Sequence, residues 1–160
     1  MKIIQVSKDD DLADVRQLFR EYCQWLAEVH GVIIDTDTVE KELRSLPGEY
    51  APPKGRLIIA YQDDKPVGCG ALKPLDEQVC VINRNYIKSA FRGKGYGKIL
   101  VRRLIEDAKI IGYQRVRLET YSFMYAAQAL YCSLGFRIIP NAQNTPHDKQ
   151  KSTIIMEVVL

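Results

Sequence analysis

A glycine-rich turn occupies residues 91–98, Phe-Arg-Gly-Lys-Gly-Tyr-Gly-Lys. It follows a β-rich run at residues 78–87 and precedes an apolar helical pattern that ends at Gly112. A strand that leads through such a turn into a helix is typical of α/β domains. Glycines let the backbone approach a ligand closely, and free amides at a helix start bind phosphate. The turn therefore predicts a pyrophosphate site.

Two common phosphate-binding motifs do not match this turn. A Walker A loop ends in Gly-Lys-Ser or Gly-Lys-Thr, whereas Gly97-Lys98 is followed by Ile99. The dinucleotide fingerprint is G-x-G-x-x-G. Gly93 and Gly95 match its first two glycines, but Lys98 stands at the position of the third. The pyrophosphate is thus expected on a different kind of ligand.

Charge is concentrated in the same region. Residues 84–117 hold ten cations and two carboxylates, for a net charge of +8 in a chain whose total is +3. Such a block indicates a polyanionic partner, either nucleic acid or a phosphorylated small molecule. These cations follow one glycine turn and one helix, without a face of interleaved aromatic residues. We therefore expect a small phosphorylated ligand and no nucleic-acid partner.

Composition predicts one domain over residues 1–160, because 46% of the chain is apolar and no linker or repeat divides it. No apolar run approaches the roughly 20 residues that span a bilayer, so no membrane partner is expected. The N-terminus becomes acidic at Asp9 and lacks a signal-peptide pattern, which favours a cytoplasmic location. No metal site is expected. The cysteines form no C-x-x-C pair and are interpreted as reduced, buried, structural thiols: Cys23, Cys69, Cys80 and Cys132.

The apolar periodicity predicts an α/β fold in the order β-α-α-β-β-β-α-β-α-β-β, with helices on the faces of a mixed sheet. Ser7 and Asp10 resemble a capping box that opens the first helix, and Gly31 would end it. Its expected buried stripe is Leu12, Val15, Phe19, Tyr22, Leu26 and Val29. Glu40 is expected to complete the cap of a second helix over residues 37–45. The expected strands are 2–6, 56–62, 66–73, 78–87, 115–120, 136–139 and 152–159, and a helix is expected over 123–134.

Two motifs together resemble one family. Residues 92–97, R-G-K-G-Y-G, are similar to the R/Q-x-x-G-x-G/A signature of the GNAT family of N-acetyltransferases, and residues 130–136, L-Y-C-S-L-G-F, resemble its later L-Y-x-x-L-G-F element. The spacing of 38 residues between the two is also similar. Over most of its length the chain further resembles a bacterial subgroup of that family whose acceptor is poorly defined, through residues 18–22, 48–53, 69–76 and 122–124.

The resemblance implies a single GNAT domain with a mixed, mostly antiparallel sheet and helices on both faces. Acetyl-CoA, the implied acyl donor, would lie between two splayed parallel central strands, here residues 78–87 and 115–120. The resemblance also implies that the later helix contributes Ala127 to donor binding. Donor-binding positions match the main chain of Asn85, Tyr86 and Ile87 and the turn residues Arg92, Gly93, Lys94, Gly95, Tyr96, Gly97 and Lys98.

By the same resemblance, Tyr131 matches the tyrosine that protonates the departing thiolate. The alternative is that Tyr131 is a core residue on an amphipathic helix. An acceptor amine must also lose a proton before it attacks, because its pKa lies near 10. Subgroup relatives often have Glu-x-Lys-Arg where this chain has Val-Ile-Asn-Arg at residues 81–84, so the carboxylate is absent. The candidate bases are a water chain or Glu21, Tyr22, Glu119 and His147.

These observations favour an acetyl-CoA-dependent N-acetyltransferase. It would transfer the acetyl group to a primary amine of a small molecule or peptide by direct attack on the thioester, as a monomer or homodimer. The alternative is a catalytically weak acyl-CoA-binding sensor or interaction protein that kept the donor site and lost the base.

Overall fold

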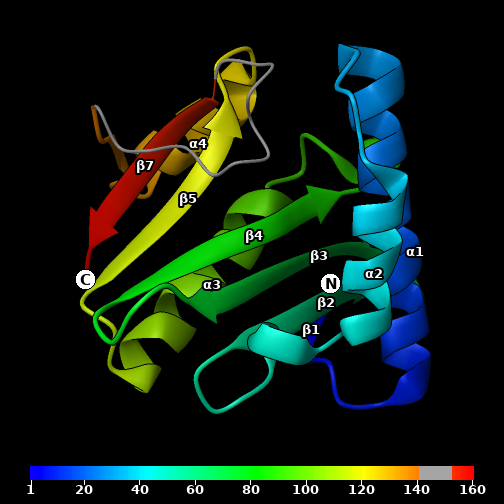
Figure 1. Cartoon of the computed structure of the whole chain (residues 1–160), viewed down its shortest axis with the longest axis horizontal. Helices are drawn as coiled ribbons and strands as arrows, with labels where there is room; N and C mark the ends of the chain where they lie inside the picture. Colours follow the sequence, from blue (N-terminus) through cyan, green and yellow to red (C-terminus); the bar gives the residue numbers. More distant parts are fainter. Residues whose placement is uncertain (141–152) are drawn as a thin grey trace.

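A seven-stranded sheet in the order β1-β2-β3-β4-β5-β7-β6 forms the centre of the protein (Figure 1). The structure is a computed structural model and describes residues 1–140 and 153–160. The helices are α1 (Asp9–His30), α2 (Thr36–Ser45), α3 (Tyr96–Ile111) and α4 (Tyr125–Ser133), with short 3₁₀ turns η1 (Gly48–Tyr50) and η2 (Ser89–Phe91). The strands are β1 (Lys2–Gln5), β2 (Arg56–Gln62), β3 (Lys65–Pro74), β4 (Val79–Ile87), β5 (Arg115–Tyr121), β6 (Arg137–Ile138) and β7 (Thr153–Val159).

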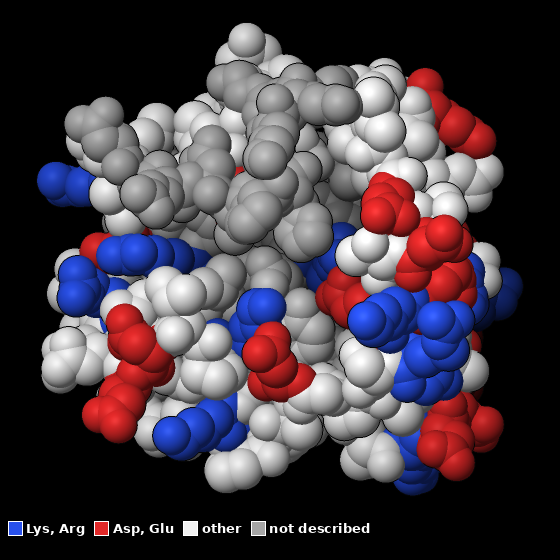
Figure 2. Space-filling view, in the orientation of Figure 1, with Lys and Arg blue, Asp and Glu red and all other residues white. Residues whose placement is uncertain are grey.

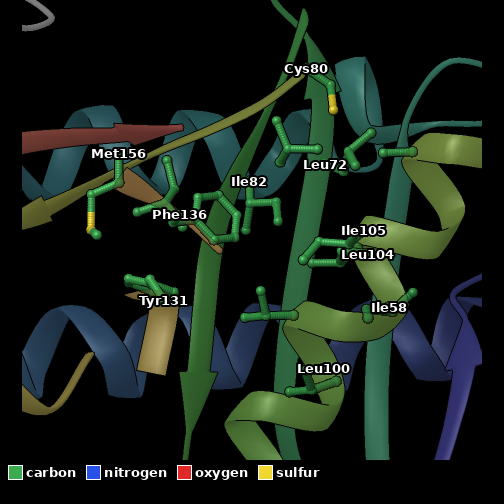
Figure 3. Close-up of a cluster of buried hydrophobic side chains, with 14 of the residues drawn as sticks. Ile58, Leu72, Cys80, Ile82, Leu100, Leu104, Ile105, Tyr131, Phe136 and Met156 are labelled. Carbon is green, nitrogen blue, oxygen red and sulfur yellow. The ribbon is translucent and has the colours of Figure 1, made fainter. Parts of the chain in front are cut away.

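The sheet is antiparallel except between β4 and β5, which run parallel, and the predicted order of elements is confirmed. Helices cover both faces. One hydrophobic cluster joins the sheet to α3 and α4 and includes Ile82, Leu100, Leu104 and Tyr131 (Figure 3). A second cluster joins the opposite face to α1 and α2. Each central strand is thus buried on both sides, which fixes β4 and β5 in the middle of the molecule.

The first helix begins later than its sequence pattern predicted. Lys8, not Ser7, occupies the N-cap position and its side chain makes no capping hydrogen bond, so the predicted capping box is wrong. Three carboxylates in the first turn, Asp9 to Asp11, favour the helix start through the helix dipole instead. Gly31 ends the helix in the left-handed conformation (φ 63°), as predicted. Val29 is 61% exposed, because a strict spacing of three and four drifts off a 3.6-residue helix.

The second helix is capped by Asp35, whose carboxylate accepts hydrogen bonds from the amides of Asp37 (3.1 Å) and Thr38 (3.2 Å). Glu40 instead pairs with Arg20 of α1 at 2.9 Å, so its predicted capping role is wrong. Among the thiols, Cys132 is exposed, contrary to expectation, while the other three are buried. Burial raises the pKa of Cys80 to about 12, which keeps that thiol protonated. No helix in the described ranges is long and apolar enough to cross a membrane.

Candidate functional site

The two parallel strands separate part-way along the sheet. Val79 to Ile82 of β4 pair with Arg115 to Leu118 of β5, and beyond this point the strands diverge (Figure 1). Asn83, Tyr86 and Ile87 pair with β3 on one side. On the other side, within the described part of the chain, residues 83–87 pair with no strand. The opening therefore presents a free β4 edge to which an extended, amide-bearing ligand can add as a strand would.

A helix start lies next to this opening. Gly95 occupies the N-cap of α3 at φ 81° and has no side chain to satisfy the first amides of the helix. A Cβ atom built at Gly95 would meet nothing within 4 Å, so the space in front of the helix start is open. Open space, free amides and the positive end of the helix dipole together make this turn fit a pyrophosphate.

Ion pairs neutralise most of the positive charge of residues 84–117, so this segment does not form a general polyanion-binding surface. Six of its ten cations pair with carboxylates: Arg84, Lys88, Arg103, Lys109, Arg115 and Arg117. Lys94 and Lys98, beside the α3 start, make no ion pair within the described residues. On the face shown in Figure 2, cations and carboxylates are intermixed instead of forming one basic patch. The free positive charge is therefore concentrated at the helix start.

Arg92 links the turn to α1. Its Nε donates to the carbonyl of Ile87 at 3.0 Å, and its guanidinium lies 4.2 Å from the ring centre of Trp25 and 5.6 Å from that of Tyr86. This cation–π stack holds the side chain against α1 and the end of β4. In this arrangement the side chain acts as a tie between elements, and the main chain of Arg92 is the part that remains at the turn.

Gly97 serves packing. A Cβ atom there would approach Leu130 of α4 to 3.3 Å, so the absence of a side chain lets α3 and α4 meet. Ala127 lies on the same helix, partly buried against the core. The glycines of the turn thus have different tasks, since Gly95 leaves space for a ligand and Gly97 leaves space for α4.

Tyr131 on α4 and Asn85 on β4 come together at the opening. Tyr131 is 8% exposed and packs on Phe136, with ring centres 5.9 Å apart. Burial raises the pKa of Tyr131, and hydrogen bonding by Asn85 opposes that rise. The Oδ1 atom of Asn85 is buried and has no hydrogen-bond partner in the described part of the chain. A protonated phenol and an amide oxygen available to a ligand therefore lie side by side.

An aromatic cluster, which the sequence analysis did not find, joins α1 to the end of β5. Tyr22 packs on Tyr86 with ring centres 5.3 Å apart, and burial, followed by the proximity of Tyr131, raises its pKa. Trp25 contacts His30 at 4.7 Å, and His30 stacks on Phe123 at 4.7 Å. These elements are far apart in sequence, and the only local signal was the three-residue spacing of Tyr22 and Trp25, which places both on one helix face.

The candidate bases differ in their surroundings. The raised pKa keeps Tyr22 protonated near neutral pH, which disfavours it as a proton acceptor. Glu21 lies 3.6 Å from Lys88, with both side chains partly exposed. Glu119 lies on β5, opposite Ile155 of β7. His147 lies outside the described residues. The structure thus leaves Glu21 and Glu119 as the carboxylates to test.

Comparison with known families decides the class. Residues 12–136 match the family model described as the Acetyltransferase (GNAT) family. The chain belongs to this family. An uncharacterized N-acetyltransferase of Schizosaccharomyces pombe is 30% identical over 139 residues, covering 86% of this chain and 83% of that protein. YjgM of Escherichia coli is 34% identical over 58% of each chain. Relatives of this GNAT protein are thus eukaryotic as well as bacterial, so the expected bacterial subgroup is not confirmed.

Solved structures share the GNAT fold. An acetyltransferase of Streptococcus agalactiae superposes with a TM-score of 0.82 at 19% identity, covering 99% of this chain and 98% of that one. PaiA N-acetyltransferase of Thermoplasma acidophilum, solved in complex with coenzyme A, superposes with a TM-score of 0.76 at 21% identity, covering 99% and 98%. These comparisons confirm three predictions from the sequence. They are the GNAT fold, membership of the N-acetyltransferases, and acetyl-CoA as the acyl donor.

Proposed function

We propose that this acetyltransferase moves the acetyl group of acetyl-CoA directly to a primary amine of a small molecule or peptide, with Tyr131 as proton donor to the leaving thiolate. The observation that carries the proposal is the meeting of Tyr131 and Asn85 at the point where β4 and β5 separate. In the reaction a C–N bond forms, the C–S bond breaks, and the sulfur receives a proton. The amine proton leaves to a base or to water.

Donor binding divides between two parts of the site. The amides of residues 95–98, with Lys94 and Lys98, would hold the pyrophosphate, since they combine free donors with unpaired charge. The main chain of Asn85, Tyr86 and Ile87 would bind the extended arm of the donor along the free edge of β4. Ala127 of α4 would border the same arm. Holding donor and acceptor together supplies much of the rate through proximity.

Tyr131 suits its role because of its environment. Burial raises its pKa, so the phenol is protonated at neutral pH and can donate. Hydrogen bonding from Asn85 stabilises the phenolate that remains after donation, which assists the transfer. A core tyrosine would need neither a nearby amide nor a position at the strand opening.

The relatives suggest which amines to test as acceptors. Rat N-acetylaspartate synthetase is 40% identical over 87 residues, which cover 54% of this chain and 29% of that protein. Its name indicates an amino acid as acceptor, so free amino acids come first in a test panel, followed by polyamines and peptide N-termini. A cytoplasmic location and the choice between monomer and homodimer stay predictions from the sequence.

The test is a screen of these amines with detection of free thiol. We expect acetyl-CoA-dependent thiol release with at least one amine, together with the acetylated product. The variants Glu21→Gln and Glu119→Gln are then assayed with that amine to identify the base. Loss of the base should lower kcat more at low pH, where the amine is protonated, than at high pH. Tight coenzyme A binding with no turnover on any amine would contradict the proposal and indicate an acyl-CoA sensor.

A further inference from the structure

The β4 strand contains a bulge at the start of the segment assigned to the donor, residues 85–87. Cys69 of β3 pairs with Tyr86, and Ala71 pairs with Asn83, so Arg84 and Asn85 together face the single residue Gly70. Two residues opposite one define a β-bulge. Arg84 has φ 57°, in the left-handed region that a side chain with a Cβ disfavours.

The bulge changes which face of the sheet the following side chains meet. Before it, Asn83 points to the α1 and α2 face, where its Nδ2 donates to the hydroxyl of Tyr50 at 3.3 Å. After it, Tyr86 packs on that same face and Ile87 packs on the α3 face. Side chains alternate along a regular strand, so an unbulged β4 would send Asn85 to the same face as Asn83. The extra residue is what directs Asn85 toward Tyr131.

The side chain of the bulge residue is held by α2. Arg84 donates from Nε to Oε1 of Glu42 at 3.3 Å, and its terminal nitrogen pairs with Oε2 of the same carboxylate. The two side chains are only 27% and 26% exposed. The hydroxyl of Tyr50 also contacts Glu42 Oε1, at 3.3 Å. A two-point ion pair of this kind fixes both the position and the orientation of the guanidinium.

We propose that Glu42 is a positioning residue for acetyl transfer, because its pair with Arg84 holds the β4 bulge that directs Asn85 toward Tyr131. The inference rests on the proposed role of Tyr131 as proton donor. Glu42 itself lies on α2, outside the reacting groups. An unfavourable backbone conformation persists only where neighbouring contacts hold it, and the Glu42 carboxylate supplies those contacts from another element.

Two substitutions of Arg84 distinguish an effect on the bulge conformation from the simple loss of the ion pair with Glu42. Arg84→Ala and Arg84→Gly both delete the guanidinium, but glycine adopts the left-handed conformation freely, whereas for alanine it is about tenfold less populated. We expect kcat of Arg84→Ala to fall about 10- to 100-fold and that of Arg84→Gly to fall much less. Equal kcat for the two variants would overturn the proposal.

A second readout needs no acceptor. With [¹³Cζ]tyrosine in the full chain, the Tyr131 resonance is assigned by its absence in Tyr131→Phe. Glu42→Gln should shift that resonance and raise its titration midpoint, because Asn85 no longer stabilises the phenolate. The control is Glu40→Gln, which breaks the exposed pair with Arg20 on the same helix and should change nothing.

An unshifted Tyr131 resonance in a folded Glu42→Gln protein would overturn the positioning role, whatever the activity of Tyr131→Phe. Full turnover of Tyr131→Phe alongside a shifted resonance in Glu42→Gln would instead overturn the proton-donor assignment and leave the bulge geometry intact. If Glu42→Gln does not fold, Arg84→Lys keeps the charge but loses the two-point contact, and the same shift is expected from it.

Discussion

Replacing Gly95 with alanine should weaken coenzyme A binding far more than it weakens the fold. Gly95 has φ 81° and Gly112, at the opposite end of α3, has φ 108°. At both positions a Cβ atom would meet nothing within 4 Å, so neither substitution creates a clash. The only cost to the fold is the left-handed backbone, about 1–2 kcal/mol for each. For a domain of this size that lowers Tm by roughly 2–8 °C.

The two glycines cap opposite ends of α3 and therefore differ in what lies in front of them. A methyl group at Gly95 would occupy the space before the α3 amides, whereas Gly112 caps the far end of the helix. A charge-assisted hydrogen bond to phosphate contributes about 1.5–3 kcal/mol, so its loss predicts a Kd for coenzyme A roughly 10- to 100-fold higher in Gly95→Ala. Gly112→Ala should bind coenzyme A as the parent does, and therefore serves as the matched control.

Isothermal titration calorimetry on both variants gives the Kd for coenzyme A, and thermal melting gives the change in Tm. Bound ligand stabilises by RT ln(1 + [L]/Kd), so at about 100 times the parent Kd the parent gains roughly 2.7 kcal/mol and Gly95→Ala clearly less. Equal coenzyme A affinity in Gly95→Ala and Gly112→Ala would contradict the assignment of the helix start as the pyrophosphate site.

Three further outcomes are expected at Tyr131 and Trp25. Tyr131→Phe should lower kcat by about 10² to 10⁴ in steady-state assays, with near-normal Tm and coenzyme A affinity; parental turnover would mean a core role only. Because burial raises the Tyr131 pKa above its usual 10.0, the protonated donor persists through alkaline pH, and kcat should show no decline below about pH 10. A decline of kcat near pH 8 that is absent in Tyr131→Phe would contradict this expectation. Trp25 is the sole tryptophan and contacts Arg92, so binding of coenzyme A should change its fluorescence. Lys94→Ala should reduce this fluorescence change at subsaturating coenzyme A.

The sequence predicted those features that depend on a single residue type, such as helix ends and the glycine turn. Gly31 and Gly112 end their helices because a left-handed residue is required there, and that requirement is visible in one residue type. The turn before α3 was found for the same reason. The Ser7 cap failed because the helix starts one residue later, with Lys8 at the N-cap and Asp9 opening an acidic first turn. Shifts of one or two residues are common at helix ends.

Non-local pairing explains what the sequence did not predict. The bulge at Arg84 is defined by the register of β4 against β3, and its side chain pairs with Glu42, which lies 42 residues earlier. No periodicity encodes either contact. The aromatic contact between His30 and Phe123 likewise joins elements from opposite halves of the chain. The resemblance located Tyr131, but Asn85 was expected to act only through its main chain, and the contact of its side chain with Tyr131 is visible only in the structure.

The early end of the β4–β5 ladder also bears on how the protein behaves at high concentration. A strand with unpaired amides and carbonyls is a template for pairing with another chain, and proteins usually protect such edges at the rim of a sheet. Here residues 83–87 lie in the middle of the sheet, where they have no strand partner on the β5 side among the described residues, and on this edge the Ile87 carbonyl accepts from Arg92. The donor arm, in the proposed binding mode, would satisfy the same groups that an intruding strand would use. Coenzyme A should therefore suppress aggregation of the purified protein beyond what its effect on Tm explains, an effect that light scattering at matched stability can measure.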